Sequence, residues 1–126
     1  MKNLKLPFKI GLHYENWEFS LEVSDVEKIK GFDTYFYLQK IKFLNTIPKR
    51  VELTFSWDIL EVVTFTLGSE QLHQLKNALN QHFKEKIKNI EIYQLENNLE
   101  LLLVYISDKI IEVSYGNKEY LREIYK

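Results

Sequence analysis

The sequence predicts an α+β fold: a bent antiparallel sheet of about seven to eight strands, with one long helix (about 70–88) packed on it and a short C-terminal helix. Three observations predict this class. Much of the chain alternates apolar and polar residues with the period of two that half-buried strands show. One stretch changes to the 3.6-residue period of an amphipathic helix. The turns between successive apolar segments are short, which favours antiparallel neighbours in one sheet. At 126 residues, the chain is expected to form a single domain, residues 1–126.

The first predicted element is a β-hairpin whose turn lies at Glu15-Asn16. Apolar and polar residues alternate over residues 8–14 and again over residues 17–23. A two-residue loop would place both apolar rows on the same side of the hairpin, as its register requires. A polar connection, residues 24–31, is expected after it.

The next two segments are rich in aromatic and β-branched side chains. Residues 32–44 are expected to form a strand, and their apolar positions change parity near Gln39-Lys40, which predicts a bulge there. Residues 51–67 alternate without interruption, but one strand of that length would extend roughly 56 Å at ~3.3 Å per residue. A domain of this size has a radius of gyration of only about 14 Å. A turn is therefore predicted near Trp57-Asp58.

The long helix is expected to begin directly after Gly68-Ser69. Ser69 suits the N-cap position, and Glu70 lies in the first turn, where the helix dipole favours negative charge. Three lysines near residue 88 would lie at the opposite, negative end of the dipole. One stripe of this helix is apolar and is expected to lie across the sheet: Leu72, Leu75, Leu79, Phe83 and Ile87.

The C-terminal part predicts three more strands and the short helix. Residues 90–95 and 99–107 are separated by Glu96-Asn97-Asn98, a favourable turn sequence. The second of these segments is apolar at both parities except at Glu100, so it is expected in the centre of the sheet with both faces covered. Residues 110–115 form the last predicted strand, and apolar residues at helical spacing follow it.

No motif for catalysis, metal binding or a cofactor is present. The chain has no cysteine, which excludes disulfides, thiolate nucleophiles and Cys-based metal sites. His73 and His82 are half a turn out of phase on the predicted helix and cannot share a metal ion. The four glycines are scattered and form no phosphate-binding loop, and no Gly-x-Ser-x-Gly elbow occurs. The sequence therefore predicts a protein that is not an enzyme and has no cofactor.

Composition also predicts where the protein acts. No apolar run approaches the length of a membrane span, and Pro7 and Lys9 interrupt the region where a signal sequence would need apolar residues. These features favour a cytoplasmic protein without membrane contact. The formal net charge is −1, so no overall field attracts nucleic acid or an anionic membrane.

Charge is segregated along the chain although its sum is close to zero. Residues 15–33 carry a net charge of −4, and residues 34–50 carry a net charge of +4. The densest acidic stretch is expected on the outward face of the first hairpin and in the connection after it. It is the predicted partner-binding surface: Glu15, Glu18, Glu22, Asp25 and Glu27.

The favoured function is a protein-binding module that occupies a partner's surface, which needs only a small rigid fold, exposed aromatic side chains and complementary charge. Its concrete form is an immunity protein that binds and blocks a basic bacterial toxin, by analogy with other small domains without motifs. One alternative is a small-ligand-binding domain or minor enzyme with an aromatic-lined pocket. Another is a weak nucleic-acid binder through Lys40–Arg50 with Tyr35 and Tyr37, which the scarcity of arginine disfavours. An exposed cluster of Trp17 or Tyr37 would instead indicate a homodimer.

Overall fold

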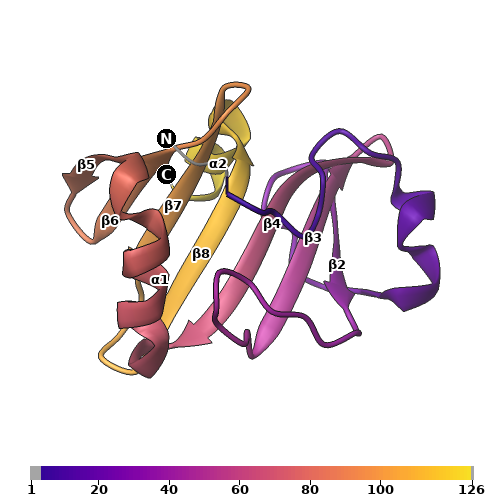
Figure 1. Cartoon of the computed structure of the whole chain (residues 1–126). Helices are drawn as coiled ribbons and strands as arrows, with labels where there is room; N and C mark the ends of the chain where they lie inside the picture. Colours follow the sequence, from indigo (N-terminus) through magenta and orange to yellow (C-terminus); the bar gives the residue numbers. More distant parts are fainter. Residues whose placement is uncertain (1–3, 126) are drawn as a thin grey trace.

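The computed structural model describes residues 4–125 and confirms the predicted α+β fold (Figure 1). In this part of the chain, eight antiparallel strands form one sheet in the order β1-β2-β3-β4-β8-β7-β6-β5, and a helix lies against each face. The strands are β1 (Leu21–Val23), β2 (Asp33–Tyr37), β3 (Arg50–Ser56), β4 (Ile59–Gly68), β5 (Phe83–Ile87), β6 (Ile90–Gln94), β7 (Leu99–Tyr105) and β8 (Ile110–Asn117). The helices are α1 (Leu72–Leu79) and α2 (Lys118–Ile124).

Two four-stranded meanders make up the sheet. Strands β1 to β4 form the first and β5 to β8 the second, and they meet where β4 pairs with β8, with Thr64 opposite Ser114. Neighbours within each meander follow one another in sequence. Short turns join most of them, whereas the longer segments 24–32 and 38–49 connect β2 to its two neighbours. The turn predicted at Trp57-Asp58 is confirmed, and both residues have positive φ (49° and 65°), as tight turns between twisted strands require.

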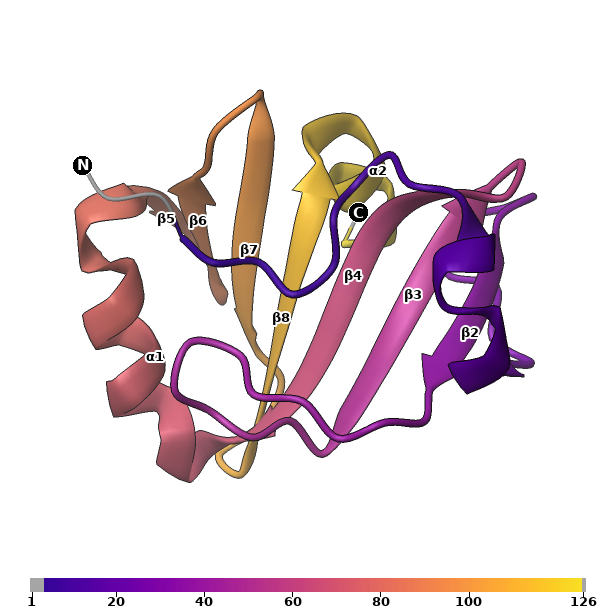
Figure 2. The ribbon, with the colours of Figure 1, turned by 45° about the vertical axis from the view of Figure 1, so that its right-hand side comes forward.

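One face of the sheet, the α1 face, carries the larger core. Leu75 of α1 is fully buried against it. The part of this face that α1 leaves open is covered by the N-terminal segment, residues 4–20, and by a loop, residues 38–49, which both cross in front of the strands in Figure 2. Phe43 of that loop stacks on Phe65 of β4, with ring centroids 4.2 Å apart.

Tyr115 of β8 holds the N-terminal segment in place. Its hydroxyl donates to the carbonyl oxygen of Phe8 (2.6 Å) and accepts from the N–H of the same residue (3.0 Å). Both residues are buried, so these hydrogen bonds satisfy backbone groups of a segment that lies outside the sheet.

The opposite face, the α2 face, holds a smaller core. Leu121 of α2 belongs to the same buried cluster as Val62 and Leu102 of the sheet, and Ile29 of the β1–β2 connection joins them. Because both faces are covered, β7 is buried along all but its two end residues, as the sequence predicts for its central strand. Hydroxyl pairs also join neighbouring strands on this face: Thr34 to Thr54 (3.1 Å) and Thr64 to Ser114 (2.8 Å).

The hairpin predicted at Glu15-Asn16 is wrong. Residues 14–20 form two short 3-10 turns, and only the last part of the predicted second strand, Leu21–Val23, pairs in the sheet. Tyr14 and Trp17 of this segment pack onto the α1 face instead of facing a partner strand, and Trp17 contacts Phe8 in this way. The two turns are Tyr14–Asn16 and Glu18–Ser20.

The long helix is confirmed on the α1 face, but it ends earlier than the predicted residue 88. Helical turns run from Ser69 to His82, and the residues after them form β5. Phe83, predicted on the helical stripe, packs edge-on against Tyr93 of β6. Pairing with β6 satisfies the backbone groups on one side of this segment, and the Phe83 ring gains its contact with Tyr93.

Two smaller predictions also fail. Ser69 does not cap the helix, because its hydroxyl donates to the carbonyl oxygen of Asp108 (2.8 Å). Strand β2 ends before Gln39-Lys40, so the bulge predicted there does not form. The change of parity in the sequence instead reflects a loop whose Phe43 enters the core.

Candidate functional site

The N-terminal 3-10 turns lie against the β3–β4 turn at one end of the sheet. The N–H of Tyr14 donates to the carbonyl oxygen of Asp58 (2.8 Å), and His13 forms an isolated β-bridge with Ile59. On the inner side, the Tyr14 ring packs edge-on against Phe55 of β3. Two segments that are far apart in the sequence therefore form one surface here (Figure 2).

Two aromatic side chains of these two segments are almost fully exposed. Phe19, in the second 3-10 turn, is 95% exposed, and Trp57, in the β3–β4 turn, is 94% exposed. Tryptophan is among the residue types that most often dominate the binding energy of protein interfaces. The tight hairpin turn fixes the backbone of Trp57, so its ring is presented from an ordered element.

Carboxylates share this end. His13 lies between Glu15 and Asp58, with nitrogen-to-oxygen distances of 4.0 and 3.9 Å. A hydrogen bond to Glu18, together with the negative charges of Glu18 and Asp58, raises the pKa of Tyr14. The negative charge is therefore concentrated enough to disfavour a further anion here. We call this surface the acidic–aromatic end and define it by Glu15, Glu18, Trp57 and Asp58. Phe19 lies away from it, because the neighbouring Ser20 carbonyl oxygen accepts from the N–H of Leu38 (2.8 Å), at the end of β2 that is farther from the β3–β4 turn.

The five predicted partner-binding residues do not share one face. Glu15 and Glu18 belong to the acidic–aromatic end. Glu22 lies on β1, and Asp25 and Glu27 lie in the β1–β2 connection, which covers the opposite, α2 face. The continuous acidic face does not form, because the hairpin that would have carried it does not form. Partner binding by these residues stays a prediction.

Sequence reasoning missed Trp57 and Asp58, and it also missed the exposure of Phe19. A signal was available for Trp57, since the sequence places it in a turn, where an aromatic side chain has no core beside it. Phe19 carried no such signal, because the alternation of the sequence assigns it to the inner face of a hairpin.

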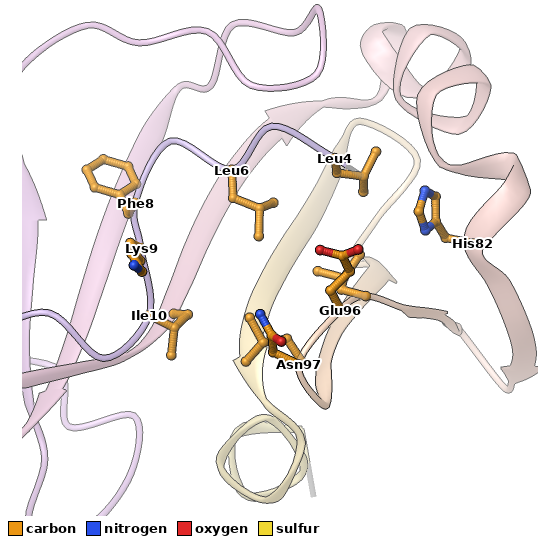
Figure 3. Close-up of a pocket in the computed structure, with 10 residues that line it drawn as sticks. Leu4, Leu6, Phe8, Lys9, Ile10, His82, Glu96 and Asn97 are labelled. Carbon is orange, nitrogen blue, oxygen red and sulfur yellow. The ribbon is translucent and has the colours of Figure 1, made fainter. Parts of the chain in front are cut away.

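A cavity of about 480 Å³ opens between the N-terminal segment and the β6–β7 turn (Figure 3). Its wall is mostly aliphatic, in contrast to the aromatic-lined pocket predicted, and Phe8 supplies the only phenyl ring among the lining residues. A cavity of this size and polarity is in the range of small-molecule sites. The apolar lining residues are Leu4, Leu6, Phe8, Ile10, Leu95 and Leu99.

Polar side chains complete the wall of this cavity. Figure 3 shows the carboxylate of Glu96 and the ring of His82 turned toward the same space, and Lys9 and Asn97 also line it. Nδ1 of His82 lies 3.2 Å from the carbonyl oxygen of Gln94. A carbonyl oxygen only accepts, so Nδ1 carries a proton and Nε2 is the acceptor in the neutral ring.

Three glutamates are buried in the sheet, one each on β3, β6 and β7. Each is paired with a cation from a segment that covers the sheet. Since an unpaired carboxylate is strongly unfavourable in the interior, these pairs hold the covering segments in place. The pairs are Glu52 with Lys28 of the β1–β2 connection (3.5 Å), Glu91 with Lys76 of α1 (3.2 Å) and Glu100 with Arg122 of α2 (3.3 Å).

Glu91 has three hydrogen-bond donors around its carboxylate. Oε1 accepts from the Tyr93 hydroxyl (2.5 Å), and Oε2 accepts from the Tyr105 hydroxyl (2.7 Å) and from Lys76 (3.2 Å). Burial by itself would raise the pKa of Glu91, but the three donors stabilise the ionised form and lower the pKa below its ordinary value. With its oxygens engaged in this way, the carboxylate anchors α1 to the sheet.

The aromatic residues suggested for other interfaces are packed inward. Tyr35 packs edge-on against Phe55, and Tyr37 packs edge-on against Phe8, so both rings are partly buried. Nucleic-acid binding through Lys40–Arg50 stays a prediction. Trp17 also packs against Phe8, and an exposed Trp17–Tyr37 cluster for a homodimer does not form.

Within residues 4–125, no three His, Asp or Glu side chains are grouped so that they could hold a metal ion. No helix in the described part of the chain is long and apolar enough to cross a membrane.

Comparisons with protein-family models, with curated proteins and with solved structures give no match. A functional proposal therefore rests on the chemistry of the chain's own surface.

Proposed function

We propose that the protein is a non-enzymatic protein-binding module whose acidic–aromatic end covers a basic surface of a partner protein. The observation that carries the proposal is the exposure of Trp57, 94%, in a turn whose Asp58 carboxylate lies near His13 together with that of Glu15. Burial of this ring against a partner removes apolar surface from water, which is the main favourable contribution to association. The carboxylates attract a basic partner and orient it.

The concrete form of this proposal is an immunity protein that binds and blocks a cognate bacterial toxin. Such a protein needs an ordered surface that is complementary to the toxin and needs no chemistry of its own. The small fold and the concentration of carboxylates at one end support this form, and analogy with other small domains supplies the rest.

The experiment that tests the proposal begins with affinity purification of the tagged protein from its native host at low salt. Mass spectrometry then identifies any protein that copurifies in stoichiometric amount. We expect one basic partner. Its affinity is next measured against two variants of the acidic–aromatic end, Trp57→Ala and the double variant Glu15→Lys with Glu18→Lys.

We expect Trp57→Ala to weaken binding by at least about tenfold, because it removes an anchor of the interface. The double charge variant should act mainly by slowing association, and its effect should diminish at high salt. The double variant Asp25→Lys with Glu27→Lys is the matched control, since it makes the same charge change on a connection that covers the other face. An equal loss of affinity in the control, or a partner that ignores all three variants, would reject the acidic–aromatic end as the binding surface.

The cavity in Figure 3 favours a second candidate function, the binding of a small and mostly aliphatic molecule. A straight-chain alcohol such as 1-octanol is a suitable probe, because it combines an apolar chain with one hydroxyl. We expect it to raise the melting temperature of the wild type but not that of Leu6→Trp, in which the new side chain fills the cavity. An equal shift in both proteins would show that the alcohol acts elsewhere.

A further inference from the structure

Strand β5 is an open edge of the sheet, on the opposite side from β1 (Figure 1). It pairs with β6 on one side, and no strand of the described chain pairs with its other side. All five of its residues, from Phe83 to Ile87, are exposed. An edge of this kind presents backbone N–H and C=O groups to which a further extended chain can bind.

An open groove lies beside this edge on the α1 face. Its volume is about 590 Å³, and it runs between the helical segment and the outer strands, where Figure 1 shows α1 standing in front of β6. The helical segment contributes Lys76, Asn77 and Asn80, β5 contributes Phe83 and Lys86, and β6 contributes Glu91 and Tyr93.

The register of β5 against β6 shows which side chains face this groove. Phe83 is opposite Tyr93, and Lys86 is opposite Glu91, so both β5 side chains lie on the α1 face. Phe83 is 51% exposed although its ring also packs against Tyr93. Lys86 lies over the ring of Tyr105, with Nζ 5.4 Å from the ring centroid. The groove therefore offers one apolar anchor and one cation directly beside the open edge.

The exposed surface of this edge is positively charged. Residues 84–88 include three exposed lysines and only one carboxylate, that of Glu85, and Lys76 adds another cation from α1. The carboxylates of Glu91, which lines the groove, and of Glu100 are buried and are paired with Lys76 (3.2 Å) and Lys84 (3.3 Å). The exposed positive charge at the edge is therefore carried mainly by Lys86 and Lys88. Lysines along an edge strand oppose its pairing with the same edge of a second copy, whereas they attract an acidic segment.

We infer that β5 and the adjoining groove bind an extended acidic segment of a partner protein, which joins the sheet beside β5. Backbone hydrogen bonds to β5 supply affinity, and side chains at alternate positions supply specificity. Acidic side chains on the α1 face reach Lys76 and Lys86, and an apolar side chain covers Phe83. This surface is separate from the acidic–aromatic end, so the inference does not depend on the proposed function.

A display library of random decapeptides, sorted against the full chain, tests the inference without a known partner. We expect enrichment of peptides that carry acidic residues at alternate positions and lack proline between them. A synthetic copy of the most enriched peptide should protect backbone amides of residues 83–87 from hydrogen exchange, as measured by nuclear magnetic resonance. Protection of amides in another element, or enrichment of peptides without acidic residues, would overturn the inference.

Two variants with the same charge change complete the test. Lys86→Glu should weaken peptide binding by about tenfold or more, because it replaces the cation at the groove with a like charge. Lys42→Glu, in the exposed part of the loop of residues 38–49, should leave the affinity within about twofold. Circular dichroism of both variants verifies the fold. Equal effects of the two variants, a failure of the library to yield a binder, or self-association of the wild type that protects the same amides would each refute binding of an acidic segment.

Discussion

Nη2 of Arg122, on α2, lies 3.3 Å from Oε1 of Glu100, a carboxylate on β7 that has no exposed surface. Lys84 of β5 approaches the other carboxylate oxygen at 3.3 Å. Both cations are partly exposed, so they reach inward from the surface to a group that water cannot reach. A buried glutamate is thus a fixed point to which a surface element is attached. The same relationship holds for Glu52 with Lys28 and for Glu91 with Lys76.

The first prediction concerns Glu100. Arg122→Ala should lower the free energy of unfolding by about 2–4 kcal/mol, because it leaves a buried carboxylate with only one cation. Glu100→Leu should cost less, since it removes the buried charge and leaves two cations that can turn toward water. Urea denaturation of both variants measures the difference. If Arg122→Ala were as stable as Glu100→Leu, the ion pair would not be what keeps α2 on the sheet.

The second prediction is a pH dependence at Glu91. The hydrogen bonds from its three donors lower the pKa in the folded state below the ordinary value of 4.5, although burial opposes this. The folded state therefore binds the proton less readily than the unfolded chain does. The stabilising contribution of the ionised Glu91 carboxylate is complete above the ordinary pKa and is lost as the pH falls through the folded-state pKa.

We therefore expect the stability difference between the wild type and Glu91→Gln to be constant near neutral pH and to shrink below pH 4.5. Urea titrations over a pH series measure it. Tyr105→Phe removes one donor and brings the folded-state pKa of Glu91 closer to 4.5, so in that variant the pH-dependent loss should be smaller and should be complete at a higher pH. A stability difference that does not change with pH would show that the Glu91 carboxylate is not stabilised by its donors.

The third prediction concerns the contact between β4 and β8 at Gly116. A Cβ atom at this position would lie 2.2 Å from the carbonyl oxygen of Glu61, which is backbone and cannot move aside easily. Gly116→Ala should therefore destabilise the protein by about 1–3 kcal/mol or more. Gly31→Ala is the control, because its Cβ meets no atom within 4 Å and only its φ of 85° opposes the change. Thermal unfolding that ranks the two variants equally would contradict the close approach.

The fourth prediction concerns alkaline pH. Burial and the neighbouring Glu112 raise the pKa of Tyr125 well above its ordinary value of 10.0. The Tyr125 hydroxyl donates to Glu112 (2.5 Å) and also lies 2.6 Å from the Ser114 hydroxyl. An unfolded chain releases this proton near pH 10.0, whereas the folded state keeps it. The stabilising contribution of the protonated Tyr125 hydroxyl is therefore complete below that pH and is lost as the pH rises through the folded-state pKa.

The absorbance of phenolate groups measures this effect. We expect part of the tyrosine signal to appear only when the protein unfolds, and we expect Tyr125→Phe to lose stability less steeply above pH 10.0 than the wild type does. Tyr120→Phe, on the same helix, is the control. A smooth titration of all tyrosines in the folded protein would show that Tyr125 is not held as described.

Much of the sheet could be predicted from the sequence, because the patterns that indicate its strands and turns lie within short stretches of the chain. The turn at Trp57-Asp58, the central position of β7 and the terminal helix α2 all follow from periodicity, length and turn residues over short stretches. The alternation of residues 8–23 was ambiguous. It is equally consistent with a hairpin and with aromatic side chains that pack onto a sheet formed by other segments, and only the folded chain distinguishes the two.

The candidate site depended still more on tertiary structure. The sequence showed where acidic residues are dense, but it placed Glu15 and Glu27 on one surface, whereas they lie on segments that cover opposite faces. It could not bring Asp58 to Tyr14, because that contact joins segments that are far apart in the chain.

By itself, the sequence determined the fold class, the order of most elements and the absence of cysteine chemistry, since these follow from residue types and their spacing. Only the tertiary structure decided which charges are buried. Glu52, Glu91 and Glu100 alternate with apolar residues just as solvent-facing glutamates do. They become buried because α1, α2 and the β1–β2 connection cover both faces of the sheet, and those covering segments bring the cations that make the burial possible.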